Sequence, residues 1–286
     1  MFSTEKLAAM VAAVCFLWLP TPSAANGGLP FFDCGVRGVD LQKMIDLTPA
    51  GATLRIRGTC ATGPYVISKT MNLVGAGSGA TLSVPSGSPF AVLTVRGTVQ
   101  VKLASLTIDA TGNNAGLDIQ KTANVAVSEL AISHGKYGIV VDFNSHADID
   151  SCDISRNEIG VAIERNSSAI INLSKIENNS NNVGLEFNSS AVLTNNSIRG
   201  GNVGVFVARL STVILAGNTI TENAQGVLIF PQYGFVGTPS PPNTIQNNKI
   251  DVQCEDKGIF DASVPSNSTT RRAVIATGCA VFGSIF

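Results

Sequence analysis

Charged residues are scarce in this sequence. Only 14% of the 286 residues are charged, and the 19 basic and 20 acidic side chains leave a formal net charge of -1. A chain without a basic surplus has no electrostatic footprint for nucleic acid or for an anionic membrane surface, so we expect neither as a partner. The low charge together with 28 glycines favours a sheet-rich, turn-rich globular fold over a helical or disordered chain.

The sequence also lacks an apolar run long enough to span a bilayer comfortably. Its longest run covers residues 7–19, follows Lys6 and is followed by a proline and the small residues Ser23 and Ala25. A transmembrane helix needs about 20 apolar residues, whereas a short apolar run with these flanks is typical of a secretory signal peptide. We therefore predict a signal peptide over residues 1–25 and a secreted or periplasmic mature protein without a membrane span.

Cysteines are few as well, and five remain after the predicted signal peptide. In an oxidising compartment the pairs near the two ends are the natural disulfides, Cys34 with Cys60 and Cys254 with Cys279. Cys152 is left over, and we interpret it as a small core residue rather than a nucleophile.

The sequence is dominated by a short internal repeat. A glycine followed by an apolar, any and an apolar residue recurs in steps of 22, 22, 24, 20 and 22, at Gly116, Gly138, Gly160, Gly184, Gly204 and Gly226. A second column has steps of 22 and a last step of 30, with an isoleucine two residues after each member: Leu130, Cys152, Ser174, Asn196, Asn218 and Asn248. We interpret the steps of 24 and 20 as one loop that grew and one that shrank without disturbing the column.

A repeat this short, with alternating apolar residues and no helical period, cannot bury its apolar face alone and must stack on its neighbours. Leucine-rich repeats have a similar length but need a leucine-rich consensus, whereas Val and Ile fill the apolar positions here. A parallel β-solenoid fits better, because like residues then lie above like residues about 4.8 Å apart. The Asn of each Asn-x-Ile turn, such as Asn196, would form a stacked turn column that indicates the fold and says nothing about activity.

The Gly-led repeats, with GNTI from Gly217 and NNKI from Asn247, resemble the parallel β-helix repeats of the pectin-lyase-like superfamily. The stretches VDLQKMIDLTPAGATLRIRGTC and YVISKTMNLVGAGSGATL are similar to the cap and first coils of such proteins. The resemblance covers roughly Val36 to Asp251 and implies an all-β, right-handed, single-stranded parallel β-helix. It does not select an activity, because the superfamily includes lyases, hydrolases, epimerases and noncatalytic adhesins.

Both ends of such a stack need covering, because an open strand edge invites aggregation. Leu41, Met44 and Ile45 are spaced as on the inner face of a short helix, with Asp40 as its N-cap. We expect an N-terminal cap and first strand over residues 26–60, a β-helix over 61–251, and a C-terminal cap over 252–286.

The outward residues of the Gly-led strands supply the candidate chemistry, because positions one and three after each glycine are apolar and point inward. Position two holds Asp118, Glu186 and Phe206, and position four holds Asp142, Glu164 and Phe230. Asp142 and Glu164 would lie about one strand spacing apart, roughly 4.8 Å.

Two bare carboxylates at that distance should share a proton or a cation. One solution is a calcium ion held by both acids with Gln120, Asn188 and water. Another is catalysis, because a carboxylate pair about 5 Å apart is in the range of retaining glycosidases. The plain alternative is a solvated polar face without function.

Basic and aromatic residues beside the acids predict an anionic sugar as ligand. Arg165 and Arg209 follow two of the strands and could bind such a sugar or, like Lys121, abstract a proton in a lyase reaction. The insertion at residues 231–242 carries Tyr233 and Phe235, which we expect beside Phe206, Leu228 and Phe230 as an aromatic surface, unless the insertion belongs to the cap.

The two histidines are weaker candidates. We place His134 in a turn before a strand and His146 in the turn after one, where it could act as a general base near Asp142. The Asp-Asp pair of polygalacturonases and the Asp-Pro-His of alginate epimerases are missing from the sequence, which counts against those activities.

Two hypotheses remain for function. The first is a secreted β-helix protein that binds an acidic polysaccharide along this face and processes it as a lyase, hydrolase or epimerase, with no cofactor or with calcium. The second is a noncatalytic carbohydrate-binding, adhesin or cell-envelope module in which the solenoid serves as a rigid rod.

Overall fold

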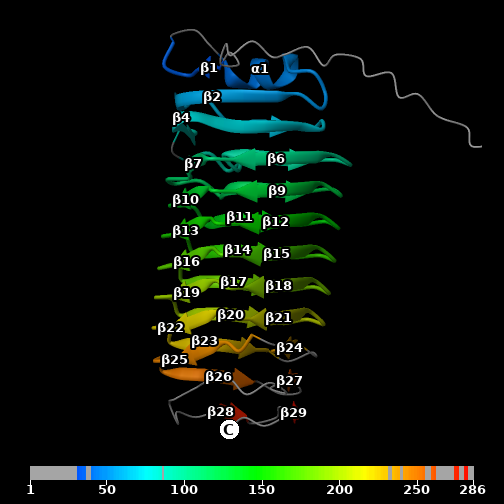
Figure 1. Cartoon of the computed structure of the whole chain (residues 1–286), viewed down its shortest axis with the longest axis vertical. Helices are drawn as coiled ribbons and strands as arrows, with labels where there is room; N and C mark the ends of the chain where they lie inside the picture. The colour runs from blue at the N-terminus through cyan, green and yellow to red at the C-terminus, as the bar shows by residue number, and fades with distance from the viewer. Residues whose placement is uncertain are drawn as a thin grey trace, which may run out of the picture. The chain divides into compact units, whose positions relative to one another are not determined.

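The chain forms a stack of parallel coils, each made of short strands joined by tight corners (Figure 1). The computed structural model describes residues 31–36, 40–85, 87–230, 234–238, 241–254, 259–261, 274–276 and 280–282. The predicted signal peptide over residues 1–25 lies outside the described residues. Every strand pair is parallel, and each coil presents three strands that belong to three ladders running along the stack. The prediction of a right-handed parallel β-helix is confirmed.

Ladder one and ladder two together make a 19-stranded sheet. Ladder one consists of β1 (Phe32–Asp33), the first halves of β2 (Thr53–Cys60) and β4 (Met71–Ser83), β6 (Gln100–Ala104), β9 (Asn124–Ser128), β12 (His146–Asp150), β15 (Ser168–Asn172), β18 (Ser190–Thr194), β21 (Thr212–Ala216), β24 (Phe235–Gly237), β27 (Ile259–Asp261) and β29 (Ala280–Phe282). Ladder two consists of the second halves of β2 and β4, β7 (Leu106–Asp109), β10 (Ala131–Ser133), β13 (Asp153–Ser155), β16 (Lys175–Glu177), β19 (Ser197–Arg199), β22 (Thr219–Thr221) and β25 (Thr244–Gln246).

Ladder three is a separate 10-stranded sheet that contains the Gly-led strands. It consists of β3 (Tyr65–Ile67), β5 (Leu93–Arg96), β8 (Ala115–Gln120), β11 (Tyr137–Val141), β14 (Ile159–Ile163), β17 (Asn181–Leu185), β20 (Val203–Val207), β23 (Gln225–Ile229), β26 (Ile250–Cys254) and β28 (Val274–Ala276). Strands β27, β28 and β29 continue the ladders beyond Asp251.

The core is a set of apolar columns inside the coils. In ladder three the inward column is fully buried in every coil from β11 to β23, at Ile139, Val161, Val183, Val205 and Val227. Branched side chains suit this site because they pack well on a pleated surface and meet a neighbour of the same shape in the next coil.

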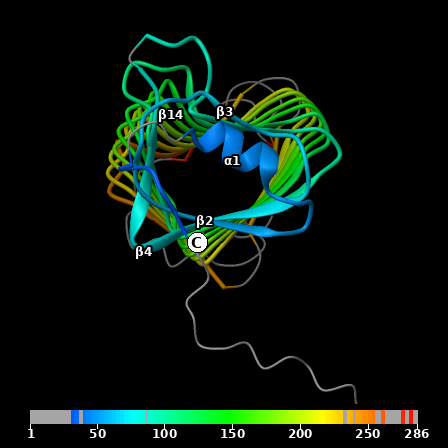
Figure 2. The same ribbon diagram turned by 90° about the horizontal axis from the view of Figure 1, so that it is seen from above.

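Helix α1 (Leu41–Leu47) covers the first coil, as the view from above shows (Figure 2). Asp40 caps it by accepting a hydrogen bond from the Gln42 backbone N–H, and Leu41 and Ile45 are buried. The Gln42 side chain then satisfies an exposed strand edge: its Oε1 accepts from the Val66 N–H at 2.7 Å and its Nε2 donates to the Val66 carbonyl at 3.0 Å. The helix therefore supplies the partners that another strand would otherwise provide.

A disulfide joins Cys34 to Cys60 and ties the start of the described chain to the end of β2. Cys254 is also disulfide-bonded, and its predicted partner Cys279 lies outside the described residues. Cys152 is free and buried, and burial raises the pKa of its thiol to about 11, which suits the predicted core role better than that of a nucleophile. Among the described residues, no helix has the length and apolar character to cross a membrane.

Buried amides stack at two corners of the coil. At the first corner, the Asn196 backbone N–H and Nδ2 both donate to Asn218 Oδ1 at 2.9 Å, and Asn218 bonds to Asn243 in the same way. The turn column predicted from the sequence is therefore present, but its last member is Asn243, with Ile245 opposite Ile220. The prediction of Asn248 after a step of 30 is wrong.

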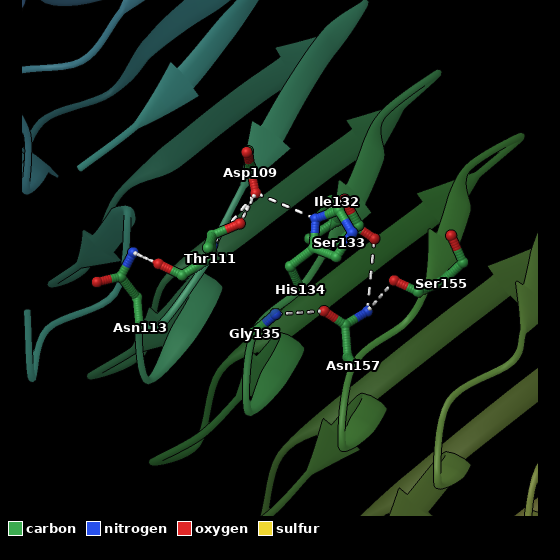
Figure 3. A network of polar contacts seen from close by, with 9 residues as sticks. All are labelled: Asp109, Thr111, Asn113, Ile132, Ser133, His134, Gly135, Ser155 and Asn157. Atoms are coloured by element: carbon green, nitrogen blue, oxygen red, sulfur yellow. Dashed lines mark hydrogen bonds and ion pairs between the residues drawn. The ribbon is translucent and has the colours of Figure 1, made fainter. Parts of the chain in front are cut away.

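The second corner holds an amide column that was not predicted from the sequence. Asn157 Oδ1 accepts from the Gly135 N–H at 2.9 Å, and its Nδ2 donates to the carbonyls of Ile132 and Ser155 (Figure 3). Asn179, Asn223 and Asn248 continue this column, and Asn248 belongs here. Each amide satisfies backbone groups that face the corner and would otherwise be buried without a partner.

The insertion near the C-terminus is shorter than the sequence suggested. Asn223 and Asn248, which are equivalent residues of successive coils at the second corner, are 25 residues apart. Equivalent residues of regular coils, such as Ser145 and Ser167, are 22 residues apart. This coil is therefore only slightly longer than a regular one. Part of the insertion is itself a strand, because β24 pairs with β21 on ladder one.

Candidate functional site

One corner of the stack, between ladder three and ladder one, gathers most of the candidate residues. Strands β8, β11, β14 and β17 lead into an outward polar residue, Gln120, Asp142, Glu164 or Glu186, and then into two residues with left-handed backbone, such as Phe143 and Asn144 with φ of 52° and 59°. Their side chains point away from the core because the chain turns here. Three columns therefore run side by side along this corner.

The first is the acid column, which contains Gln120, Asp142, Glu164 and Glu186. Backbone hydrogen bonds between successive coils, Glu164 to Val141 and Glu186 to Ile163, fix the alignment. Glu186 therefore stands directly after Glu164, which brings three carboxylates together where the sequence predicted two.

Glu186 was assigned to position two because the glycines were aligned with each other, and that alignment is wrong. Gly184 pairs with Ala162 and Phe206, while Asn182 occupies the position that a glycine holds in the other coils. The repeat keeps its step of 22 here, so no loop grew or shrank.

Next to the acids lies the Phe–Arg row, defined as Lys121, Phe143, Arg165, Phe187 and Arg209. Basic and aromatic residues alternate along it, coil by coil. The Arg165 guanidinium carbon is 4.5 Å from the Phe143 ring centroid, and that of Arg209 is 4.3 Å from the Phe187 centroid. Cation–π contact at these distances holds both guanidinium groups against a ring.

The acid column also forms ion pairs with the arginines of the Phe–Arg row. Arg165 forms an ion pair with Asp142 and lies 3.4 Å from a Glu164 oxygen, and Arg209 lies 3.8 Å from Glu186. The cation that two close carboxylates were expected to share is thus a guanidinium from the neighbouring column.

The third column, the amide column of the hollow, contains Thr122, Asn144, Asn166, Asn188 and Leu210. Asn188 Nδ2 donates to Asn166 Oδ1 at 2.9 Å. A surface hollow of about 860 Å³ lies over this column and the Phe–Arg row, lined by Phe143, Asn144, Arg165, Asn166, Phe187, Asn188, Arg209 and Leu210. Phe143 and Phe187 remain 46% and 41% exposed, so their rings can still contact a ligand.

Burial changes the acidity of the carboxyl groups behind the hollow. Desolvation raises the pKa of Asp142 and of Glu164 above their ordinary values, and the Arg165 guanidinium opposes the increase in both. Desolvation also raises the pKa of Asp118, whose Oδ2 accepts a hydrogen bond from Gln120. A raised pKa means that the neutral form of each of these carboxyl groups is favoured more than it would be in water.

The predicted aromatic surface is present in part. Phe206 and Phe230 form an edge-to-face pair with centroids 5.6 Å apart, at the C-terminal end of the same sheet. Phe235 begins β24 opposite Thr212, on ladder one rather than on this sheet. Tyr233 lies outside the described residues.

Neither of the two histidines is among the residues that line the hollow. His134 sits at the second corner, where its Nδ1 is 3.1 Å from Ser133 Oγ and 3.2 Å from Asp109 Oδ1 (Figure 3). His146 is the first residue of β12 rather than a turn residue, and its two nitrogens contact Ser168 and Asp148. These contacts give no support to a general-base role beside Asp142.

No group of three or more Asp, Glu, His or Cys residues in the described part of the chain could hold a metal ion. The calcium site at Asp142 and Glu164 stays a prediction, and Arg165 competes for the same oxygens.

Phe143 and Phe187 were not predicted as site residues, although the sequence carries a signal for them. The motif of an acid, Phe or Arg, Asn and Ser recurs once per coil, as DFNS from Asp142, ERNS from Glu164 and EFNS from Glu186. The repeat was aligned only over the strand positions, so the two residues that follow each strand were not compared between coils.

Comparisons with known proteins agree with the architecture. The family described as the right-handed β-helix region matches residues 92–250. No curated protein sequence matches the chain.

Solved structures with a similar fold include pectate lyase Pel9A, at 11% identity and a TM-score of 0.58, covering 85% of this chain and 77% of the other. An alginate lyase from Paenibacillus sp. str. FPU-7 has 11% identity, a TM-score of 0.58, and coverage of 85% and 95%. The periplasmic alginate epimerase AlgG has 16% identity, a TM-score of 0.52, and coverage of 86% and 82%. At these identities the likeness shows the fold alone. The family match over residues 92–250 shows that this chain belongs to the right-handed β-helix family.

Proposed function

We propose that the chain binds an acidic polysaccharide in the hollow along the Phe–Arg row. The observation that carries the proposal is that Arg165 and Arg209 are each fixed on a phenylalanine ring and open to solvent in one hollow. A guanidinium binds a carboxylate with directed hydrogen bonds, and an aromatic ring offers a flat surface to the apolar face of a sugar.

The surroundings support a sugar ligand rather than another anion. Asn144, Asn166 and Asn188 place amides along the hollow, where they can exchange hydrogen bonds with hydroxyl groups. Pectate and alginate, named for the structurally similar lyases, are both acidic polysaccharides.

Binding is tested with polygalacturonate, alginate and hyaluronan as acidic polymers, and dextran as the uncharged one, by isothermal titration. We expect at least one acidic polymer to bind and dextran to bind weakly. Arg209→Gln should weaken binding about tenfold, as expected for a lost charge-assisted contact. Arg199→Gln is the matched control, because Arg199 is as exposed as Arg209 and also pairs with an acid, Glu177, but lies on ladder two.

The aromatic contribution has its own control. Phe187→Ala should weaken binding, whereas Leu173→Ala should not, because Leu173 is also exposed and has left-handed backbone at a different corner. If no acidic polymer binds, or if both members of each pair behave alike, the proposal is wrong.

The second candidate is processing of the bound polymer by lyase, hydrolase or epimerase chemistry. The raised pKa values of Asp142 and Glu164, which burial causes, favour it because such carboxyl groups can donate and accept protons. The test is incubation with the same polymers, with and without calcium, while unsaturated products, reducing ends and uronate configuration are followed. Turnover that Glu164→Gln abolishes would support catalysis; its absence leaves a noncatalytic binding, adhesin or envelope module.

We further propose that the protein works outside the cytoplasm, secreted or in the periplasm. The Cys34–Cys60 disulfide supports this, because such bonds persist in oxidising compartments. Mass spectrometry of the mature N-terminus would test the cleavage expected after Ala25.

A further inference from the structure

The spacing of charge along the Phe–Arg row carries information about the ligand. Successive members of the row are one coil apart, and coils are separated by about 4.8 Å. Arg165 and Arg209 are therefore two coils apart, with Phe187 between them. Lys121 lies two coils before Arg165, with Phe143 between them. A cation thus recurs at roughly 10 Å.

The two flanks of the row differ in charge. On one flank lie Asp142, Glu164 and Glu186, which form ion pairs with the arginines. On the other flank the side chains that line the hollow are uncharged, mainly the asparagines. A ligand lying along the row therefore meets fixed negative charge on one side only.

The balance of charge is unsuited to a densely charged polyanion. Three cations, Lys121, Arg165 and Arg209, face four carboxylates, which are those of Asp118, Asp142, Glu164 and Glu186. A polymer with a charge on every sugar would bring more negative groups than the row can neutralise, and like charges held close in a partly desolvated site repel.

We propose that the row selects a linear polysaccharide with one carboxylate on every second sugar, with a neutral sugar over each phenylalanine. The proposal rests on the proposed function and names the ligand class of that same hollow. A sugar in an extended chain is about as long as one coil spacing, so an alternating polymer sets its carboxylates at the pitch of the cations.

The acid column explains why a uniform polyuronate fits less well. Neighbouring sugars of an extended chain face opposite ways, so a polymer with a carboxylate on each sugar presents them on both flanks. Half of them would then face Asp142, Glu164 and Glu186. An alternating polymer places all its carboxylates on one flank and turns hydroxyl or amide donors toward the acids, which accept such hydrogen bonds.

The decisive measurement compares oligosaccharides of equal sugar number by isothermal titration of the full chain. Hyaluronan oligosaccharides carry a carboxylate on alternate sugars, and oligogalacturonates carry one on each. We expect hyaluronan to bind at least about tenfold more tightly, although it has half the charge. If oligogalacturonate binds equally or more tightly, this inference is wrong and the proposed function stands. If neither binds, this inference is wrong, and the proposed function is wrong as well if alginate also fails to bind.

A variant tests the pitch itself. Phe187→Arg places a third guanidinium between Arg165 and Arg209, so that a cation occurs at every coil there. We expect the preference for hyaluronan to fall about tenfold or to reverse, whereas the control Leu173→Arg adds the same charge on a different corner and should leave the preference unchanged. An unchanged preference in a folded Phe187→Arg protein, or an equal change in both variants, would overturn the inference.

Discussion

Left-handed backbone occurs at every corner of this coil, so its presence alone does not mark the hollow. Phe143 and Arg165 have φ of 52° and 51°, but so do Ser151, at 54°, and Leu173, at 50°, on another corner. Such a conformation costs about 1 kcal/mol or more in a non-glycine residue, so the turns are costly wherever they occur. The corner of the hollow differs in having two such residues in succession, as at Phe143 and Asn144, and in the chemistry of the side chains that it exposes.

One pair of residues shows how tightly the corners are coupled to the strands. In regular coils an asparagine amide packs against a glycine of the ladder-three strand in the preceding coil, as Asn179 does against Gly160, where an added Cβ would lie 2.8 Å from Asn179 Nδ2. In one coil the two residue types are exchanged. Gly201 stands at the corner, and Asn182 in β17 supplies the amide, which donates to Asn223 Oδ1 at 3.1 Å.

This exchange predicts a compensating pair of substitutions. Asn182→Gly removes a buried amide with its hydrogen bonds. Gly201→Asn forces a Cβ to within 2.7 Å of the Asn179 carbonyl oxygen and 2.9 Å of Asn182 Nδ2, of which the double variant relieves the second contact. Each single variant should cost about 1–3 kcal/mol of unfolding free energy. In the double variant the new amide enters the space that the old one leaves. The loss should fall below the sum of the single losses by at least about 1 kcal/mol, measured by urea unfolding. Additive losses would show that the two sites are independent.

Among the larger elements, the acid column is the one in which neighbouring carboxylates repel each other. Burial favours the neutral form of Glu164, and its neighbours Asp142 and Glu186 add to this effect. The arginines of the neighbouring row, Arg165 and Arg209, favour the charged form. The pKa of Glu164 is therefore raised in the folded chain above its ordinary value of 4.5. A carboxyl of this kind contributes stability that is full below the unfolded pKa and is lost as the pH rises through the folded pKa.

Glu164→Gln should remove this pH dependence. Below about pH 4 the wild type and the variant should have similar unfolding free energies, and the variant should gain relative to the wild type as the pH rises toward about 7. Urea unfolding across this range measures the difference. Glu177→Gln serves as the comparison, because Glu177 pairs with Arg199 at 3.1 Å on ladder two. A wild type that gains on Glu164→Gln as the pH rises would contradict the sign of the raised pKa.

The columns themselves were predictable from the sequence, because a stacked repeat places equivalent residues at a fixed interval. That interval located the buried valines and isoleucines and the Asn196 turn column, and the apolar spacing at residues 41–45 located the helical cap, without any structure. The alignment failed at Gly184, because a glycine two residues from the true position has the same apolar neighbours. Only the backbone hydrogen bonds assign that position to Asn182.

The site could be predicted only in part. The repeat predicted that Asp142 and Glu164 lie in successive coils and that Arg165 and Arg209 follow two of the strands. The ion pairs of these arginines depend on how far each side chain reaches across columns. The phenylalanines were missed because aromatic residues after a strand have no fixed meaning in a sequence. Their contact with the arginines depends on the corner, which sets each ring against a guanidinium.

At the scale of the whole molecule, the described part of the chain after residue 30 behaves as a one-dimensional array. Each strand contacts its equivalents in the coils before and after, as β15 does with β12 and β18. The stability of such an array is approximately a sum of terms for each coil and for each interface between coils. A complete coil is therefore a unit that can be removed while the remaining coils stack in register.

This property allows the spacing of the cations along the Phe–Arg row to be changed by deletion of a whole coil, without any substitution in the coils that remain. Deletion of residues 145–166 removes one coil of 22 residues and joins Asn144 to Ser167, which are equivalent to Asn166 and Ser145. The row then reads Lys121, Phe143, Phe187, Arg209, so two rings are adjacent and the alternation is broken. We expect a folded protein by circular dichroism, and loss of the preference for hyaluronan over oligogalacturonate in titration.

Deletion of residues 123–166 is the matched control, because it removes two coils and leaves the row as Lys121, Phe187, Arg209. Alternation is then kept in a shorter hollow, so affinity should fall while the preference between the two polymers remains. A one-coil deletion that keeps the preference, or a two-coil deletion that folds but loses it, would mean that the ligand is not read by the spacing of the cations. The same pair of deletions tests whether the array is modular, since a sum of coil and interface terms predicts that the two-coil deletion loses about twice the unfolding free energy that the one-coil deletion loses.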